Sequence, residues 1–257
     1  MLYLKKSLGQ NFLKDQNIIN KIINLKNIKN KNIVEIGPGN GALTKKILDK
    51  NPKSLIVIEK DNRLLKKLKE KYKKNKSIIF YNNDILKTDL EKIIKKDSVI
   101  FGNLPYNISS QILIRLIKFK KWPPKFKDLI LMFQKEVAEK ISGKSYGRLS
   151  IISNYRLKYL NKFDVSANCF FPKPKVTSTV LHLMPLKNIN YKINNINNLE
   201  YITNIFFSNK RKMVNKNIKK IFKPNEIKKF KNLNLKSRPS DLTKEFYYKA
   251  AEIYENR

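Results

Sequence analysis

The feature that most constrains this fold is a glycine-rich turn that directly follows a short apolar run. Residues 32–36 read Asn-Ile-Val-Glu-Ile, and Gly37, Gly39 and Gly41 occupy three of the next five positions. Glycine has no Cβ, so the backbone can turn tightly here and approach a ligand closely. Apolar residues at helical spacing follow over residues 42–50. The pattern predicts a strand, a glycine turn and a helix whose first N–H groups face a ligand.

An acidic residue one βαβ unit later indicates the kind of ligand. The apolar run 55–58 ends at Glu59, where a carboxylate can accept hydrogen bonds from both hydroxyls of a ribose. The glycine spacing is G-x-G-x-G rather than the G-x-G-x-x-G that seats a pyrophosphate, and no Gly-Lys-Ser/Thr of a P-loop follows. These features favour a nucleoside without phosphates, and we expect S-adenosylmethionine. A tight turn without a ligand is the alternative.

Apolar runs and helical patterns alternate along the first 186 residues. This alternation predicts an α/β fold, an open and mostly parallel sheet with helices on both faces. Asp15 or Asn17 is expected to cap the first helix, and Ser109 or Asn107 the helix that ends near residue 118. Besides the first two strands, strands are expected at 78–81, 98–101, 129–133, 149–160 and 176–184, and helices at 62–74 and 134–141.

Only helical periodicity remains beyond residue 186, after an Asn-rich linker. We therefore expect two domains, 1–186 for the methyl donor and 187–257 as a small helical domain that binds RNA. Residues 209–222 are expected to form a basic helix that carries Lys210, Arg211 and Lys212, which suits contact with phosphates. A solvated lysine face is the alternative.

The charge of the chain points to a polyanionic partner. There are 56 basic and 20 acidic residues, for a formal net charge of +36. Such an excess favours nucleic acid, with an anionic membrane surface as the minor alternative. Only seven of the basic residues are arginine, and Lys, Asn and Ile are abundant. Part of the charge can therefore reflect an AT-rich coding sequence rather than function.

Two residue types that often carry chemistry are rare. Cys169 is the single cysteine, which excludes a disulfide framework or a cysteine zinc site, and we expect no metal. His182, the single histidine, lies in an alternating apolar run and is expected to face solvent rather than act as a base. No apolar run is as long as a membrane span, so a soluble cytoplasmic protein is expected.

The stretch Asn-Leu-Pro-Tyr at 103–106 is the sharpest chemical signal. An exocyclic amine of a base is a poor nucleophile because its lone pair is delocalised into the ring. The Asn103 side-chain oxygen and the Leu104 carbonyl can accept its N–H groups and favour a more nucleophilic nitrogen. Pro105 stiffens the turn, and Tyr106 offers a flat face for a base removed from its stack. An ordinary turn is the alternative.

A further acid, Asp84, follows the strand expected at 78–81. At that strand end it would meet the same crevice and could accept a hydrogen bond from an adenine amine. It could also cap a helix that begins at Ile85. The two roles are not exclusive.

Short segments along nearly the whole chain carry a family resemblance: 6–13, 35–41, Glu59, Asp84, 102–109, 134–137, 146–150, 171–178, 210–212 and 238–242. Through them the chain resembles the ribosomal RNA adenine dimethyltransferase family, most closely its KsgA/RsmA branch. The resemblance implies a Rossmann-like class I methyltransferase that dimethylates N6 of two adjacent adenines near the 3′ end of 16S rRNA. It further implies that the substrate is the pre-30S particle, with a role in subunit biogenesis, and we expect a monomer.

The resemblance also assigns roles to individual residues. Phe171 becomes a second stacking candidate, with plain core as its alternative. Residues 6–13 become a lid over the donor, where composition alone suggests a disordered basic tail. Lys210, Arg211 and Lys212 become RNA contacts. Contacts with S-adenosylmethionine are implied for Asn11, Leu13, Gly37, Gly39, Glu59, Asp84 and Asn103, while Glu35 supports the loop.

Two positions depart from the family pattern. Asn83 stands where many relatives have glycine, and Ala167 where proline is usual. Two other functions remain as alternatives. One is the sister branch that dimethylates one adenine of 23S rRNA and confers macrolide resistance, and the other is a non-catalytic RNA-binding assembly factor.

Overall fold

The computed structural model describes residues 10–230 and 233–257, so residues 6–9 of the expected lid lie outside the described part. The chain forms two compact units. The first runs to Ala138 and includes Lys158–Pro185, and the second consists of Glu139–Leu157 and Leu186–Arg257. The predicted division into 1–186 and 187–257 differs from this grouping in residues 139–157 and at Leu186.

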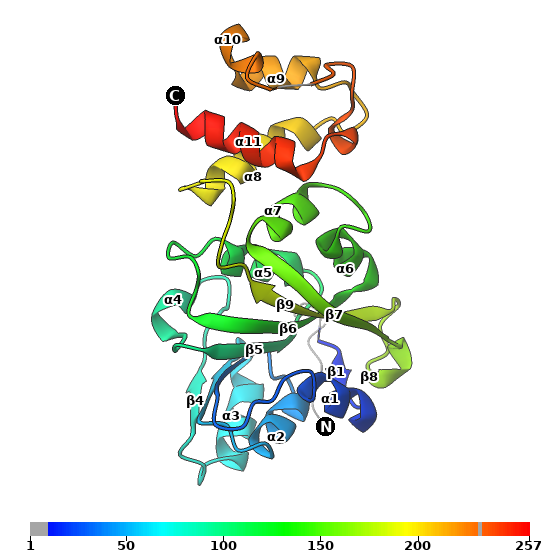
Figure 1. The fold of residues 1–257 in the computed structure, drawn as a ribbon. Helices are drawn as coiled ribbons and strands as arrows, with labels where there is room; N and C mark the ends of the chain where they lie inside the picture. Colours follow the sequence, from blue (N-terminus) through cyan, green and yellow to red (C-terminus); the bar gives the residue numbers. More distant parts are fainter. Residues whose placement is uncertain (1–9, 231–232) are drawn as a thin grey trace. The chain divides into compact units, whose positions relative to one another are not determined.

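A seven-stranded sheet forms the centre of the first unit (Figure 1). The strand order is β4-β3-β2-β5-β6-β9-β7. The strands β4, β3, β2, β5 and β6 are parallel to one another, and β9 is antiparallel to β6. The mostly parallel sheet that the sequence predicts is confirmed. The strands are β2 (Asn32–Ile36), β3 (Ser54–Ile58), β4 (Ile78–Tyr81), β5 (Ser98–Asn103), β6 (Phe126–Gln134), β7 (Leu157–Val165) and β9 (Ser178–Pro185).

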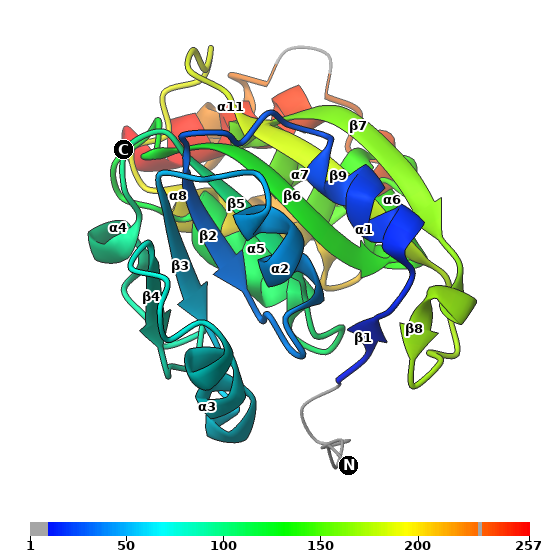
Figure 2. The same cartoon turned by 90° about the horizontal axis from the view of Figure 1, so that it is seen from below.

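Helices cover both faces of this sheet, as expected (Figure 1, Figure 2). On one face lie α1 (Gln16–Ile23), α2 (Ala42–Leu48) and α3 (Asn62–Lys71), and on the other lies α5 (Ser109–Ile117). The short α4 (Leu90–Ile93) precedes β5, and α6 (Lys135–Ser142) follows β6. Residues Ile22, Ile47 and Leu65 of the first face pack with alternate strand residues into one core. Asp15 caps α1 through its side chain, as one of the two expected caps.

The strand order places two of the predicted motifs side by side. From β2 the chain moves outward through β3 and β4, then returns to β5 on the other side of β2. Ligands of such sheets bind where the order reverses, at the carboxyl ends of the strands. Ile36 pairs with Gly102, so the glycine turn after β2 and Asn103 at the end of β5 are neighbours.

A separate two-stranded ribbon joins the N-terminal segment to a distant loop. Strand β1 (Phe12–Leu13) is antiparallel to β8 (Phe170–Phe171), with Phe12 opposite Phe171. The Lys14 N–H extends the pairing by donating to the Cys169 carbonyl at 2.9 Å. A 3₁₀ turn, η2 (Ala167–Cys169), leads into β8.

The prediction of a strand over residues 149–160 is wrong for its first part. Residues 148–156 form helix α7 (Arg148–Arg156), and β7 begins only at Leu157. The helix is buried on most of its surface, including Ile151, Ile152 and Tyr155. The buried residues also include the polar Ser150, Ser153 and Arg156, so the sequence lacks the one-sided 3.6-residue period that distinguishes a helix from a strand.

The expectation that His182 faces solvent is also wrong. Its side chain is buried, and Nε2 lies 2.7 Å from Oδ1 of the buried Asp128 carboxylate. Lys26 reaches the other oxygen of Asp128 at 3.1 Å. Strand β9 lies between β6 and β7, and nearly all of its residues are buried. The alternation of polar and apolar residues in β9 therefore reflects the buried pair of His182 and Asp128, not a solvent-exposed face of the strand.

The second unit is helical in its C-terminal part, with an aromatic core. Ring contacts join Phe206, Tyr247 and Phe246, and a second group joins Tyr155, Tyr191 and Tyr248. No helix in the described part of the chain is both long and apolar enough to cross a membrane. The elements are α8 (Ile196–Phe207), α9 (Asn215–Ile221), α10 (Pro224–Ile227), η3 (Pro239–Asp241) and α11 (Lys244–Glu255).

The basic helix expected over residues 209–222 is shorter than predicted. Helix α9 begins at Asn215, and Lys210, Arg211 and Lys212 lie in the exposed turn that precedes it. The Lys212 N–H donates to the Asn209 carbonyl at 2.9 Å, which closes this turn.

Candidate active site

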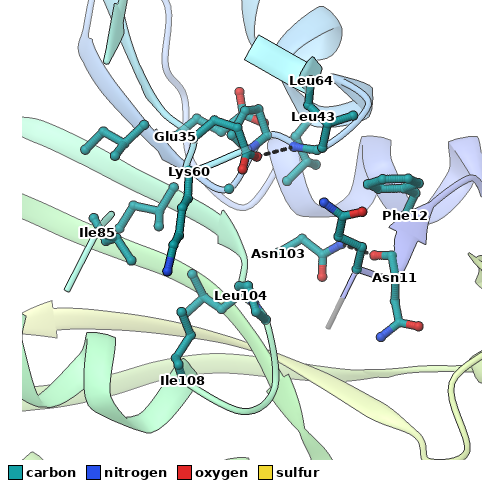
Figure 3. Close-up of a pocket in the computed structure, with 18 of the residues that line it drawn as sticks. Asn11, Phe12, Glu35, Leu43, Lys60, Leu64, Ile85, Asn103, Leu104 and Ile108 are labelled. Carbon is teal, nitrogen blue, oxygen red and sulfur yellow. Dashed lines mark hydrogen bonds between the residues drawn. The ribbon is translucent and has the colours of Figure 1, made fainter. Parts of the chain in front are cut away.

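A single pocket gathers the residues that the sequence singles out (Figure 3). It lies at the carboxyl ends of β2, β3 and β5, over the glycine turn. In the close-up, Lys60 and Ile85 stand on one side, and Asn11, Phe12 and Asn103 on the other. The structure brings together every predicted donor and catalytic residue here: Asn11, Leu13, Glu35, Gly37, Gly39, Glu59, Asp84, Asn103, Leu104, Pro105 and Tyr106.

The glycine turn forms one wall of this pocket because its backbone adopts a conformation that side chains disfavour. The φ angles of Gly37 and Gly39 are +67° and +57°. A Cβ on Gly39 would lie 2.8 Å from the Phe12 ring, so the ring rests directly on the backbone. A Cβ on Gly37 would point toward the Asn103 carbonyl, at 3.8 Å. Both positions therefore require glycine, the one residue without a side chain.

Glu35 lies buried behind the turn. Its side chain points to the same face of β2 as that of Ile33, and helix α2 covers this face. From α2, the Thr44 hydroxyl donates a hydrogen bond to Glu35 Oε2 at 2.7 Å. Oε1 of Glu35 accepts no hydrogen bond from any of the described residues. Burial raises the pKa of the carboxyl from 4.5 to about 7, with the nearby Glu59 charge adding to the effect.

Glu59 connects the end of β3 to the glycine turn. Its Oε2 accepts the Gly39 N–H at 3.3 Å, and its Oε1 accepts the Asp61 N–H at 2.8 Å. Burial raises the pKa of Glu59, although these backbone hydrogen bonds oppose the shift. Each carboxylate oxygen has two lone pairs, so both can accept a second hydrogen bond from a ligand hydroxyl.

Asp84 follows β4, and its side chain lies beside that of Lys60, which follows β3. Oδ1 accepts the Leu86 N–H at 2.9 Å, and Oδ2 pairs with Lys60 Nζ at 2.9 Å. The hydrogen bond from Lys60 lowers the pKa of this carboxyl. The residues after Asp84 form a turn rather than the helix expected at Ile85. Asp84 caps that turn and at the same time lines the pocket.

The Asn-Leu-Pro-Tyr stretch leaves β5 at the pocket edge. Asn103 Nδ2 donates to the Asn11 carbonyl at 3.0 Å, and the Leu104 side chain is buried. The Tyr106 hydroxyl lies 2.5 Å from Ser178 Oγ on β9, which holds the ring in place. Neither expected cap of α5 acts as one. The residue at the cap position is Ile108, without a side-chain hydrogen bond, and Ser109 Oγ instead donates to the Tyr106 carbonyl.

Four predicted substrate residues do not line the pocket. Phe171 is 63% exposed on β8 opposite Phe12, so the plain-core alternative is wrong for it. Lys210, Arg211 and Lys212 are exposed in the second unit.

Sequence reasoning missed several residues that line the pocket or support its lining. Thr44 supports Glu35, Phe12 packs on Gly39, and Gln10 Nε2 reaches Asp61 Oδ2 at 3.1 Å. Lys60 could have been considered, because it directly follows the acid at the end of β3. Nothing in the local sequence pairs Glu35 with Thr44 nine residues later.

The fold and the pocket together define a class I S-adenosylmethionine-dependent methyltransferase. The donor fits the residues present: a glycine cradle without Cβ atoms, a carboxylate at the end of β3 for ribose hydroxyls, and acidic groups that suit its positive charges. No Gly-Lys-Ser/Thr loop for phosphates accompanies them.

Comparison with known proteins identifies the family. The model of the family described as ribosomal RNA adenine dimethylase matches residues 1–256. A Ribosomal RNA small subunit methyltransferase A of Pelagibacter ubique is 43% identical, over 98% of this chain and 97% of that protein. The protein of the same name from Buchnera aphidicola is 42% identical, over 88% of each. The chain belongs to the ribosomal RNA adenine dimethylase family.

Solved structures agree with this assignment. A dimethyladenosine transferase from Plasmodium falciparum superposes with a TM-score of 0.73 at 28% identity, covering 93% of this chain and 95% of that one. The 23S rRNA methyltransferase ErmE superposes with a TM-score of 0.70 at 21% identity, covering 95% and 99%. The likeness to ErmE shows a shared fold alone.

Proposed function

We propose that this chain dimethylates N6 of two adjacent adenines near the 3′ end of 16S rRNA, using S-adenosylmethionine. Its substrate would be the pre-30S particle in the cytoplasm, where it would act as a monomer in subunit biogenesis. The observation that carries the proposal is the placement of Asn103–Tyr106 beside the glycine turn, through the pairing of Ile36 with Gly102. The names of the small-subunit relatives favour 16S rRNA over other RNA substrates.

Residues at the carboxyl ends of β2, β3 and β4, together with the N-terminal segment around β1, would hold the donor. When bound, S-adenosylmethionine supplies a methyl group that its sulfonium already activates. Glu59 would accept hydrogen bonds from the ribose hydroxyls, and Asp84 Oδ2 from the adenine amine. Asn11, Leu13 and the backbone of Gly37 and Gly39 would enclose the remainder, with Glu35 behind the turn.

Residues after β5 would hold the target adenine. Asn103 Oδ1 and the Leu104 carbonyl would accept the two N–H groups of its amine, which orients the nitrogen lone pair toward the methyl group. The Tyr106 ring, fixed through Ser178, would stack on the base. Phe171, exposed on β8, would offer a second stacking surface, and Lys210, Arg211 and Lys212 would contact phosphates. Most of the rate would come from this alignment, because no metal or strong base is required.

A methylation assay on three substrates tests the proposal. Pre-30S particles, protein-free 16S rRNA and protein-free 23S rRNA are each incubated with protein and labelled donor, and the modified bases are mapped by mass spectrometry. We expect N6,N6-dimethyladenine at two adjacent positions near the 3′ end of 16S rRNA, in the particles. Modification of a single adenine in 23S rRNA would instead assign the sister activity. RNA binding without any methyl transfer would indicate a non-catalytic assembly factor.

A further inference from the structure

Strand β1 occupies a position that the proposed catalysis does not yet explain. It lies between the glycine turn of the donor pocket, the reaction centre at Asn103 and the exposed Phe171. The ring of Phe12 rests on Gly39, and the backbone of β1 pairs with β8. Asn11 precedes this strand, and its carbonyl meets the Asn103 side chain. A two-residue strand is thus fixed on three sides.

The contact between Asn11 and Asn103 settles which way the Asn103 amide points. A backbone carbonyl can only accept a hydrogen bond, so the group that faces it at 3.0 Å must be the NH₂ of the amide. The opposite assignment would place two acceptors against each other. Oδ1 of Asn103 therefore forms the other end of the planar amide group and points away from the Asn11 carbonyl. An acceptor at Oδ1 is what the amine of the target base requires.

We propose that β1 is a positioning element for catalysis, in which Phe12, seated on Gly39, sets the Asn11 carbonyl that orients the Asn103 amide. This inference rests on the proposed function, because it assigns Asn103 Oδ1 to the target amine. Phe12 does not touch the amine and acts only through Asn11 and Asn103. Without the orienting carbonyl, the amide can rotate by 180° and present NH₂, a donor that repels the N–H groups of the amine.

Asn11 and Phe12 take part in the contact with Asn103 in different ways. The orienting atom of Asn11 belongs to the backbone, so truncating the Asn11 side chain leaves it in place. Truncating Phe12 leaves the Asn11 side chain intact but removes the ring that rests on Gly39. The two substitutions are therefore expected to affect different kinetic constants, which a general loss of stability would not do.

The experiment compares Phe12→Ala, Phe12→Leu and Asn11→Ala with the wild type, in methylation of pre-30S particles. We expect kcat at saturating donor to fall at least tenfold in Phe12→Ala and by less than threefold in Phe12→Leu, which retains apolar packing. Asn11→Ala is expected to raise the KM for the donor while kcat stays within threefold of the wild type. Phe163→Ala is the matched control, since Phe163 is a partly buried phenylalanine that packs against the core of the first unit and does not line the pocket. Its kcat is expected to match the wild type.

Two outcomes separate the inference from the function on which it rests. A wild-type protein that fails to methylate any adenine refutes the proposed function. An active wild type with an unchanged kcat in folded Phe12→Ala refutes only the role of β1. If Phe12→Ala does not fold, Phe12→Thr takes its place with the same expectation, because threonine keeps the strand preference but lacks both the ring and the apolar packing that leucine retains.

Discussion

The Thr44 hydroxyl donates to Oε2 of Glu35 at 2.7 Å, and this is the hydrogen bond that holds the buried carboxyl behind the glycine turn. A single neutral donor offsets little of the desolvation of a carboxylate, so the pKa of Glu35 rises to about 7. The folded protein thus keeps a proton that the unfolded chain releases near pH 4.5. The two states differ in bound protons only between these two pH values.

Glu35→Gln is expected to flatten the pH dependence of stability. In the wild type, the free energy of unfolding falls as the pH rises from 4.5 to about 7, because the unfolded chain loses the proton first. The loss attributable to Glu35 is about 3 kcal/mol. Above pH 7 Glu35→Gln is therefore expected to be the more stable protein, whereas below pH 4.5 the two are alike. Urea unfolding from pH 5 to 8 measures this.

The control for this prediction is Glu70→Gln, which removes an exposed carboxylate on α3. Its unfolding curve is expected to follow the wild type throughout. If the wild type and Glu35→Gln lose stability in parallel between pH 5 and 8, Glu35 is not protonated in the folded protein near neutral pH.

Asn103→Ala is expected to abolish the acceptor for the target amine while sparing the fold. We expect kcat/KM for pre-30S particles to fall by about a hundredfold or more, the size of effect seen when one oriented polar group is removed from a reaction centre. Asn103→Asp is expected to be impaired as well, because its carboxylate cannot donate to the Asn11 carbonyl. Product formation under single turnover measures both variants. Thermal unfolding and binding of S-adenosylhomocysteine serve as controls, and kcat/KM within threefold of the wild type would exclude Asn103 from catalysis.

The elements around the site could be predicted because their signals are local. Short apolar runs identify strand 32–36 and the strand that ends at Glu59. The three closely spaced glycines between them identify a tight turn, because few other structures require them. Parallel pairing then brings their carboxyl ends to one edge of the sheet. The pocket residues that share this edge were found from the sequence for that reason.

Features that depend on packing were not predictable in the same way. Helix α7 is buried on most sides and its buried residues include serines and an arginine, so its sequence shows no helical period of apolar residues. His182 has its partner Asp128 54 residues away, on a neighbouring strand that local sequence does not identify. The orientation of the Asn103 amide depends on the carbonyl of Asn11, 92 residues earlier. Contacts of this kind follow from the assembled fold and not from the spacing of residues.

Asp84→Ala and Lys60→Met are expected to differ in their effect on the donor. Asp84→Ala removes both the proposed acceptor for the adenine amine and the cap of the turn at Leu86. Its dissociation constant for S-adenosylhomocysteine is expected to rise at least tenfold. Lys60→Met keeps an apolar stem and loses an ion pair whose lysine is 60% exposed. Such pairs contribute about 1 kcal/mol or less, so a change below fivefold is expected.

Isothermal calorimetry measures both variants at one salt concentration. Equal weakening by the two substitutions would mean that the Lys60–Asp84 pair, rather than Asp84 itself, binds the donor. No weakening by Asp84→Ala would remove Asp84 from the donor site.

Asp128→Ala is expected to destabilise the fold without weakening the binding of S-adenosylhomocysteine. It leaves the buried His182 ring without its acceptor and removes the partner of Lys26, which predicts a loss of about 3 kcal/mol. Burial alone would raise the pKa of Asp128, but the bonds from His182 and Lys26 outweigh it and lower the pKa. The contribution of this carboxylate is therefore present above pH 4 and lost in more acidic solution.

Urea unfolding measures the loss, and calorimetry with S-adenosylhomocysteine is the control. Asp128→Asn, which keeps an acceptor for His182, is expected to lose less stability than Asp128→Ala. Equal stability of Asp128→Ala and the wild type would contradict a structural role for the pair.

Replacing Lys210, Arg211 and Lys212 with alanine is expected to reduce the salt dependence of RNA binding. Each phosphate contact contributes about 0.7 to 0.9 to the slope of log affinity against log salt, so three contacts contribute roughly 2 to 3. The matched control replaces Lys66, Lys67 and Lys69 of α3, which removes the same charge from an exposed helix of the first unit. Filter binding of a 16S rRNA 3′-end fragment from 50 to 300 mM KCl measures the slopes. We expect the control to keep the wild-type slope within about one unit, since only phosphates in contact release counterions. A similar decrease in both triple variants would mean that the net charge of +36, and not the turn before α9, determines the affinity.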